Sequence, residues 1–277
     1  MSRIEGRLRE LRVAGRKALV TFITGGDPNR ATTVPALHAL VEGGADVIEV
    51  GVPFSDPEAE GPAIQKSSER ALIGGTRLTH VLDMVREFRE EDAATPVLLM
   101  GYLNSVERMG YGEFVARAAD AGVDGMIVVN LPPEEAGELA QLMHARELDL
   151  IFLIAPTTTP ERIALIAARA SGFIYYVALK GVTGANHLRT EGIAEQIERI
   201  RANTELPIMI GFGIKDGASA QLVAPLADGV VVGSALVMTM ERNVRNPPME
   251  CPQAPIFSGF ADGNRFNEAT AFNTSAV

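Results

Sequence analysis

Cysteine is almost absent from this chain: Cys251 is the only one in 277 residues. A single cysteine cannot form a disulfide within the chain, which excludes a disulfide scaffold and is typical of a reducing compartment. Long apolar runs are missing too, because none approaches the roughly 18 residues that indicate a membrane span. The first residues, MSRIEGRLRELRVAGRK, contain no apolar segment of the kind found in secretory signals. We therefore expect a cytoplasmic protein.

Positive charge is also in short supply, with 25 Lys and Arg residues against 35 Asp and Glu residues and a net charge of −10. An acidic chain is a poor match for nucleic acids and for anionic membrane surfaces, so we expect neither as a partner. Hydrophobic residues make up 47% of the chain, which is enough to bury a large core. The length suits one large domain or two small ones.

The common motifs for metal, nucleophile and cofactor chemistry are missing as well. The four histidines do not have the spacing of metal ligands; they are His38, His80, His144 and His187. No Ser-His-Asp or Cys-His arrangement can be argued from the sequence. The dinucleotide fingerprint G-x-G-x-x-G is absent after the first β-rich run, where the chain reads TGGDPN. We expect chemistry that needs neither a metal ion nor an organic cofactor.

The sequence does contain a repeated alternation of β-rich and helical segments. Short apolar runs, typical of strands buried on both faces, occupy eight places: 18–23, 46–50, 96–100, 124–129, 148–154, 173–178, 207–212 and 228–233. Helical patterns such as EEAGELAQLMHARE lie between them. Eight such units predict a (β/α)8 TIM barrel rather than the alternative, an open doubly wound sheet. An extra N-terminal helix is also predicted, because Ser2 and Glu5 form a capping box ahead of apolar positions 4, 8 and 11.

The segment DVIEVGVPFSDPEAEGP raises the question of why Glu49 stands inside an apolar strand. It shares a strand face with Val47, near the carboxyl end where barrel enzymes have their active sites. Burial there would raise the pKa of its carboxyl group and suit it to proton transfer near neutral pH. A structural glutamate with a buried partner is an equally good interpretation on position alone. The carboxylates at 56, 58 and 60 lie in a proline-stiffened loop, which in isolation resembles an ordinary acidic surface loop.

Three glycine-bearing turns follow the last three predicted strands: GVTGANH (181–187), GFGIKDG (211–217) and GSALV (233–237). Backbone amides of such turns, together with a helix beginning near Ser234, can hold an anion. Phosphate sites of this kind recur in the last loops of barrels, so the turns indicate a phosphorylated ligand. Phe22, Tyr175 and Phe212 could line a pocket for a flat aromatic substrate, although packing in the core is the commoner role of aromatic residues.

Over about residues 1–240 the chain resembles the tryptophan synthase α chain family. The matching stretches include FITGGDP, IEVGVPFSDP, LLMGYLN, FLIAPTTT, YYVALKGVTGANH, GFGI and DGVVVGSALV. The resemblance implies a barrel lyase that cleaves indole-3-glycerol phosphate to indole and glyceraldehyde 3-phosphate in L-tryptophan biosynthesis. It also implies a pyridoxal-phosphate-dependent β chain as partner, in an α2β2 heterotetramer, and no cofactor in the α chain itself.

The resemblance also implies roles for individual residues. Glu49 matches the acid/base glutamate, which protonates C3 of the indole ring and assists deprotonation of the adjacent glycerol hydroxyl. Glu60 stands where the family has an aspartate that binds the indole N–H. The implied phosphate-binding positions are Gly184, Gly213, Gly233 and Ser234. The implied pocket positions are Phe22, Tyr175 and Phe212, and Asp56 and Asn104 fall where the family contacts its β partner.

Three departures from the family pattern bear on the expected activity. The extra methylene of Glu60 moves the carboxylate by about an ångström, and a misplacement of that size can cost about 100-fold in rate. Asn130 stands where aspartate is usual, and Ala178 replaces a common serine. Together these changes predict weakened or altered catalysis. Two alternatives to an α subunit therefore stay open: a non-catalytic barrel that regulates a β partner, and a stand-alone lyase that releases indole.

The end of the chain differs most from the family. We expect a catalytic domain at 1–240 and a divergent tail at 241–277 that replaces the usual closing helix, because Pro247, Pro248, Pro252 and Pro255 would break a long helix. The tail also contains four phenylalanines, an unusual number for a disordered segment. They would pack over the groove between the first and last strands, pack against another subunit, or remain exposed and lower the stability.

Overall fold

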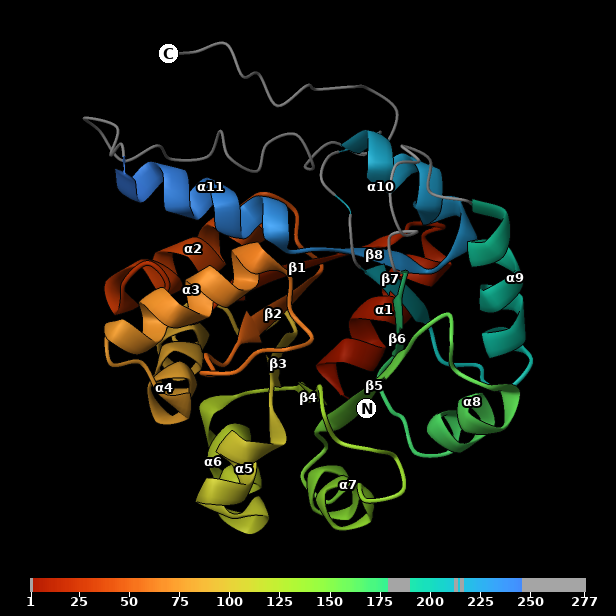
Figure 1. Ribbon diagram of the computed structural model, residues 1–277, viewed down its shortest axis with the longest axis horizontal. Helices are drawn as coiled ribbons and strands as arrows, with labels where there is room; N and C mark the ends of the chain where they lie inside the picture. Colours follow the sequence, from red (N-terminus) through yellow and green to blue (C-terminus); the bar gives the residue numbers. More distant parts are fainter. Residues whose placement is uncertain (1, 179–189, 212–213, 215–216, 246–277) are drawn as a thin grey trace.

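The structure is a computed structural model that describes residues 2–178, 190–211, 214 and 217–245. Its described part is a closed barrel of parallel strands in chain order, with β1 paired to β8 (Figure 1). The strands are β1 (Ala18–Thr24), β2 (Val47–Gly51), β3 (Val97–Gly101), β4 (Gly125–Val128), β5 (Asp149–Ile154), β6 (Ile174–Val177), β7 (Ile208–Gly211) and β8 (Gly229–Val232). The predicted (β/α)8 barrel is confirmed, and the closing β1–β8 pair excludes the open sheet.

Helices surround the barrel and connect consecutive strands (Figure 1). They are α1 (Arg3–Val13), α2 (Arg30–Glu42), α3 (Pro62–Ile73), α4 (Leu78–Arg89), α5 (Leu103–Met109), α6 (Tyr111–Ala121), α7 (Gly137–His144), α8 (Pro160–Ala167), α9 (Thr190–Arg201), α10 (Gly217–Val223), the 3₁₀ turn η1 (Ala224–Leu226) and α11 (Ser234–Arg245). Local chemistry sets several of their ends. The Thr159 side chain caps α8 just before Pro160, and Gly122 ends α6 in the left-handed conformation.

Each strand buries one face inside the barrel and the other under the helices, which explains why the strands are apolar throughout. Ile48 and Val50 of β2 belong to the layer between strands and helices, whereas Val47 belongs to the barrel interior. The apolar face of α1, formed by Ile4, Leu8 and Leu11, packs into this interior at the end where the strands begin. The predicted N-terminal helix is confirmed, and it closes one end of the barrel.

Aspartates at the beginnings of four strands hold this closed end together: Asp46, Asp124 and Asp149 are buried, and Asp228 is partly buried. Asp46 accepts hydrogen bonds from the Leu19 amide (2.9 Å) and the Arg7 guanidinium (2.8 Å). Asp124 likewise accepts from the Val97 amide and from arginines of α1 and α4. Asp46 and Asp124 therefore each satisfy a buried backbone donor and tie neighbouring elements together.

The last described helix, α11, crosses the boundary that we set between residues 240 and 241. It packs against β1 and α3 and continues to Arg245. The rest of the expected tail, 246–277, lies outside the described residues, as do its prolines and phenylalanines. The division into a catalytic domain and a tail stays a prediction. None of the helices in the described residues combines the length and the apolar character that crossing a membrane would require.

Candidate active site

Glu49 lies inside the barrel near the carboxyl end of β2. Its Cα pairs in register with those of Phe22 on β1 and Leu98 on β3, and its strand face is that of Val47. The side chain is 0% exposed, and neither carboxyl oxygen has a hydrogen-bond partner among the described residues. Burial and, second, the nearby Glu60 carboxylate raise the pKa of Glu49 to about 8. A buried carboxyl group without a partner is costly for stability, so this geometry argues against the structural interpretation of Glu49.

Glu60 lies in the loop that follows β2, close enough to Glu49 for its charge to raise the pKa of Glu49. The Gln65 amide of α3 donates to the Glu60 carbonyl (3.0 Å), and the Tyr102 hydroxyl accepts from the Ala59 amide (3.0 Å). The ring of Tyr102 also stacks on Phe54, with centroids 4.9 Å apart. Burial raises the pKa of Glu60 to about 7. These contacts position the end of the loop that carries Glu60, whereas Asp56 and Glu58 are exposed, as in an ordinary surface loop.

Tyr175 of β6 faces this carboxylate pair from across the barrel. Its ring lies against Gly211 at the end of β7, where any side chain larger than glycine would collide with the phenol. Burial and then the charges of Glu49 and Glu60 raise the pKa of its hydroxyl, which therefore stays protonated and able to donate. Tyr175 is thus a neutral donor close to both glutamates.

Phe22 of β1 lies next to the predicted phosphate end. Its ring covers Gly51 of β2, and its first carbon atoms lie close to Gly233 after β8. The helix α11 begins at Ser234, immediately after Gly233. The Gly233 carbonyl accepts hydrogen bonds from the backbone amides of Leu236 and Val237 in the first turn of this helix. Gly233 and Ser234 therefore lie at a helix N-terminus beside Phe22, which is the arrangement expected of an anion site.

Several predicted positions are not at the centre of the site. Gly184, Phe212 and Gly213 lie outside the described residues, so their roles stay predictions. Asp56 and Asn104 are exposed, as a contact with a partner would require. The Asn130 amide donates weakly to Asn104 (3.4 Å), and its carbonyl oxygen accepts the Leu103 amide at the beginning of α5 (2.8 Å).

Ala178, another departure from the family pattern, is buried, and its amide donates to the Gly211 carbonyl (3.0 Å). Its side chain belongs to the layer between strands and helices, as does that of Tyr176, whereas Tyr175 packs with the barrel interior. Sequence reasoning missed Tyr102, Phe54 and Gln65 as residues that position the Glu60 loop. The signal available for Tyr102 was its place directly after the third apolar run, where the carboxyl end of β3 meets the same face.

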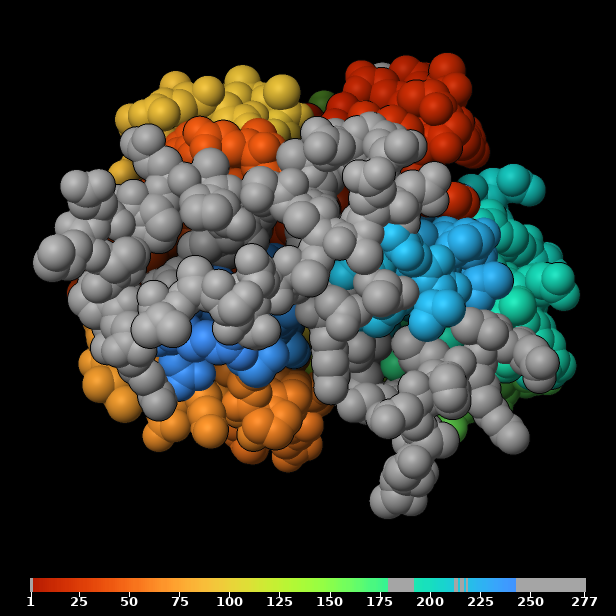
Figure 2. Space-filling model, turned by 90° about the horizontal axis from the view of Figure 1, so that it is seen from above, coloured from red at the N-terminus to blue at the C-terminus, as the bar shows by residue number. Residues whose placement is uncertain are grey.

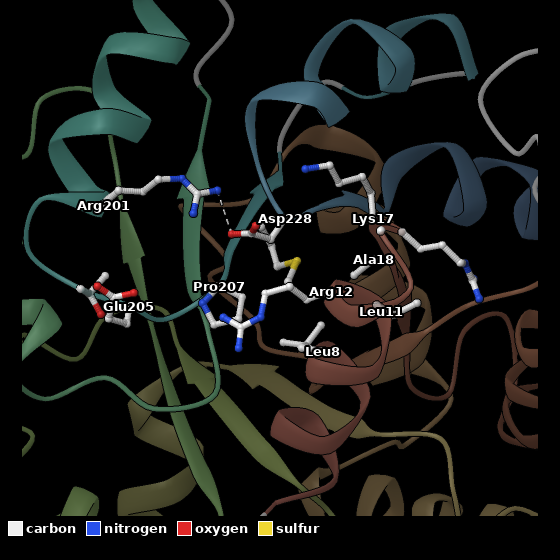
Figure 3. Close-up of a pocket in the computed structure, with 13 residues that line it drawn as sticks. Leu8, Leu11, Arg12, Lys17, Ala18, Arg201, Glu205, Pro207 and Asp228 are labelled. Atoms are coloured by element: carbon white, nitrogen blue, oxygen red, sulfur yellow. Dashed lines mark hydrogen bonds and ion pairs between the residues drawn. The ribbon is translucent and has the colours of Figure 1, made fainter.

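A separate cavity of about 360 Å³ lies at the opposite end of the barrel, between α1 and the beginnings of β1, β7 and β8 (Figure 3). Its walls carry both charge signs. Arg201 pairs with Asp228 (3.0 Å), and Lys17 donates to the Ala227 carbonyl. None of the predicted site residues lines it. Within the described residues, no cluster of His, Cys, Asp and Glu is arranged to bind a metal ion.

Comparisons with known proteins agree with this geometry. A family model described as tryptophan synthase alpha chain matches residues 8–261. The tryptophan synthase alpha chain of Thioalkalivibrio sulfidiphilus is 55% identical over 247 residues, 89% of this chain and 93% of the relative. That of Chromobacterium violaceum is 57% identical over 241 residues, 87% of this chain and 91% of the relative.

Solved structures give the same result. The crystal structure of tryptophan synthase subunit alpha from Legionella pneumophila superposes with a TM-score of 0.82 at 44% identity, covering 88% of this chain and 91% of that one. The tryptophan synthase from M. tuberculosis in its aminoacrylate-bound form superposes with a TM-score of 0.80 at 36% identity, covering 87% of this chain and 93% of that one. The chain belongs to the tryptophan synthase alpha chain family.

Proposed function

We propose that Glu49 and Glu60 are the catalytic pair with which this chain cleaves indole-3-glycerol phosphate. The family's activity is the retro-aldol cleavage of this substrate to indole and glyceraldehyde 3-phosphate in tryptophan biosynthesis, and the chain is a lyase of this type. The observation that supports these residue roles is the Glu49 carboxyl group, buried without a described partner at the carboxyl end of the barrel beside a second carboxylate.

Glu49 is suited to deliver a proton to the ring. With a pKa of about 8 it is mostly protonated at neutral pH, so it can act as a general acid toward C3 of the indole. Protonation of C3 makes the ring a cationic iminium and leaves Glu49 ionised. The Glu49 carboxylate then accepts the proton of the adjacent glycerol hydroxyl. The electrons of that O–H bond form the new aldehyde, and those of the broken carbon–carbon bond return to the ring.

Glu60 is suited to stabilise the iminium cation that forms when C3 of the indole is protonated. Its pKa of about 7 leaves a large ionised fraction at neutral pH, and a carboxylate that accepts the indole N–H stabilises positive charge on the nitrogen. The barrel interior excludes water, so this interaction is stronger than it would be in solution. Backbone amides at Gly233 and Ser234 hold the phosphate, which orients the bond to be broken.

The structure also supports a proposal about the partner and the location. Asp56 and Asn104 are exposed at the end of the barrel that carries Glu60, so a β chain could dock there and assemble as α2β2. A cytoplasmic location agrees with a biosynthetic enzyme of this family. The regulatory barrel and the stand-alone lyase can both be distinguished from an α subunit by experiment. A regulatory barrel would bind the phosphate ligand without turnover, and a stand-alone lyase would need no β chain.

The test is to incubate the purified chain with indole-3-glycerol phosphate and measure glyceraldehyde 3-phosphate, first alone and then with a β chain. We expect turnover that increases when the β chain is added. Glu49→Gln should lower kcat by at least about 1000-fold because it removes the only proposed proton donor. Glu113→Gln, on the exposed face of α6, is the matched control. Full activity of Glu49→Gln would remove Glu49 from the mechanism, and absence of turnover by the native chain under both conditions would refute the lyase.

A further inference from the structure

The side chain of Arg70 stands at the junction of three elements that carry different parts of the site. It belongs to α3, and its guanidinium makes two hydrogen bonds to the Asp27 carboxylate after β1, from Nε at 2.7 Å and from Nη2 at 2.9 Å. Its Nη1 lies 3.5 Å from Glu241 Oε1 on α11. Asp27 is only 1% exposed and the Arg70 side chain is 27% exposed, so the pair is a two-bond contact partly shielded from water.

The first of these elements, α3, determines where Glu60 lies. Glu60 is separated from the first helical residue, Pro62, only by Gly61. The Gln65 side chain donates to the Glu60 carbonyl, and so the loop is attached to the first turn of α3. A shift or rotation of α3 on the barrel would therefore move the Glu60 carboxylate with it.

Two side-chain contacts hold α3 to the end of β1. One is the buried hydrogen bond between the Thr24 and Ser67 hydroxyls, at 2.6 Å. The other is the Arg70–Asp27 pair, one helical turn further along. The hydroxyl contact is a single bond about which a helix can pivot. The two-bond arginine contact, with its planar geometry, fixes the direction of α3.

The third element, α11, carries the proposed phosphate end. It begins at Ser234 after Gly233 and packs alongside α3 and β1. Figure 1 and Figure 2 both show α11, in blue, lying against the orange segment that contains α3. Glu241 lies about two turns beyond Ser234, so its contact with Arg70 joins α11 to the helix that positions Glu60.

We propose that Arg70 is a positioning residue that sets the distance between the Glu60 carboxylate and the phosphate-binding end of the barrel. The substrate spans these two points, with its indole N–H at one and its phosphate at the other. This role rests on the proposed function. Without Arg70, each helix still packs on the barrel, but no other side chain in the described part of the chain contacts both Asp27 and α11.

The experiment compares kcat and KM for indole-3-glycerol phosphate in a small set of variants. Arg70→Met alone leaves Asp27 as a buried charge without its arginine, so the double variant Asp27→Asn/Arg70→Met, which removes both charges, keeps the test valid if the single variant is unstable. Arg70→Lys keeps the charge but cannot make both bonds to Asp27. Arg117→Met removes an exposed helix pair on α6 and is the control.

We expect the double variant to unfold at nearly the native temperature and to lose about 10- to 100-fold in kcat, since a shift of about 1 Å at the reacting groups has effects of that size. Arg70→Lys should recover part of that loss, and Arg117→Met should match the native chain. Glu241→Gln weakens the ion pair between Arg70 and α11 and leaves the Arg70–Asp27 pair in place, so it should raise KM several-fold and change kcat by less than about 2-fold. A folded double variant with native kcat would overturn the inference and reduce Arg70 to a stabilising ion pair.

A second readout does not depend on turnover. A ¹³C-NMR titration of the Glu60 carboxyl group should give a lower pKa in the double variant than in the native chain, because an α3 helix no longer fixed to Asp27 carries Glu60 toward solvent. An unchanged Glu60 titration would contradict the positioning role even if the native chain proved inactive. An inactive native chain with a shifted titration would refute the proposed function and leave the geometric coupling supported.

Discussion

At the scale of single residues, Glu49 combines two properties that rarely occur together. It is fully buried, and its carboxyl oxygens have no hydrogen-bond partner within the part of the chain that the structure describes. Buried polar groups are nearly always paired, so such a group is a mark of function rather than of packing. The free-energy cost of burying the Glu49 carboxyl group should be measurable as a dependence of stability on pH.

Glu49→Gln should stabilise the folded chain at high pH. The unfolded glutamate ionises near its ordinary pKa of 4.5, and the folded one near 8, so the folded state holds the extra proton between these values. The free energy of unfolding of the native chain therefore falls as pH rises through this window, by at most about 5 kcal/mol, and that of the glutamine variant does not. Thermal unfolding at pH 5 and pH 9 should give a higher Tm for the variant only at pH 9. Equal curves at both values would show that Glu49 is ionised or solvated in the native state.

The kcat of the chain should depend more on the charge of the side chain at position 60 than on its length. Glu60→Gln removes the negative charge opposite the indole nitrogen, and we expect kcat to fall about 100-fold. Glu60→Asp keeps the charge and shortens the side chain to that of the family's usual aspartate, so we expect a rate equal to or above the native one. Steady-state kinetics of the two variants decides this. A fully active glutamine variant, or an inactive aspartate variant, would contradict the role of Glu60.

At the scale of elements, one end of the barrel is closed by the apolar face of α1 and by aspartates at the beginnings of the strands. Asp124 shows how it works, because it accepts from Val97 of β3, Arg89 of α4 and Arg3 of α1. The side chain of Arg89 is only 10% exposed and also donates to three backbone carbonyls. The proposed active site lies at the opposite end, so changes here should affect stability and leave the reaction unchanged.

Asp124→Asn should destabilise the fold by about 3 kcal/mol, because it leaves the Arg89 guanidinium largely buried without its anionic partner. The kcat of the remaining folded protein should not change. Chemical denaturation followed by circular dichroism measures the first effect, and an assay at low temperature measures the second. Glu113→Gln, which breaks only an exposed pair, should change the stability by less than about 0.5 kcal/mol. A loss of kcat in folded Asp124→Asn would show that the two barrel ends are coupled.

At the scale of the whole molecule, the fold depends on the closing contact between the last strand and the first. β8 pairs with both β1 and β7, and Gly229 lies in register with Ala18 of β1 and Met209 of β7. A methyl group at Gly229 would lie about 2.7 Å from the Cβ of Ala18 and 2.6 Å from its carbonyl oxygen. These contacts involve backbone and a short side chain, which cannot move aside.

Gly229→Ala should therefore destabilise the barrel by about 3 kcal/mol or more. Gly112→Ala provides the control, since this glycine lies in α6 with open space around the added carbon. That change should stabilise the chain by about 0.5–1 kcal/mol through helix propensity. The denaturant midpoints of Gly229→Ala and Gly112→Ala, compared with that of the native chain, test these two predictions. A native midpoint for Gly229→Ala would mean that the barrel does not close as tightly as these contacts require.

Much of the fold could be predicted from local pattern, because the alternation of strands and helices depends on periodicities that a short window of sequence contains. The expected runs 18–23 and 46–50 became β1 and β2 with shifts of a single residue at their ends. The inward direction of Glu49 followed from the two-residue period that it shares with Val47. The position of α11 beyond residue 240 was less accessible, because the prolines that follow it suggested an earlier end.

The sequence by itself determined the order of the strands, the face on which each strand residue lies, and the charge types available at the carboxyl end. Only the tertiary structure decided that Glu49 is left without a described partner, that Glu60 and Tyr175 approach it from separate strands and loops, and that Arg70 joins α3 to β1 and α11. These facts depend on distances between residues far apart in the chain. Such distances are set by barrel closure and helix packing, which no local pattern of residues specifies.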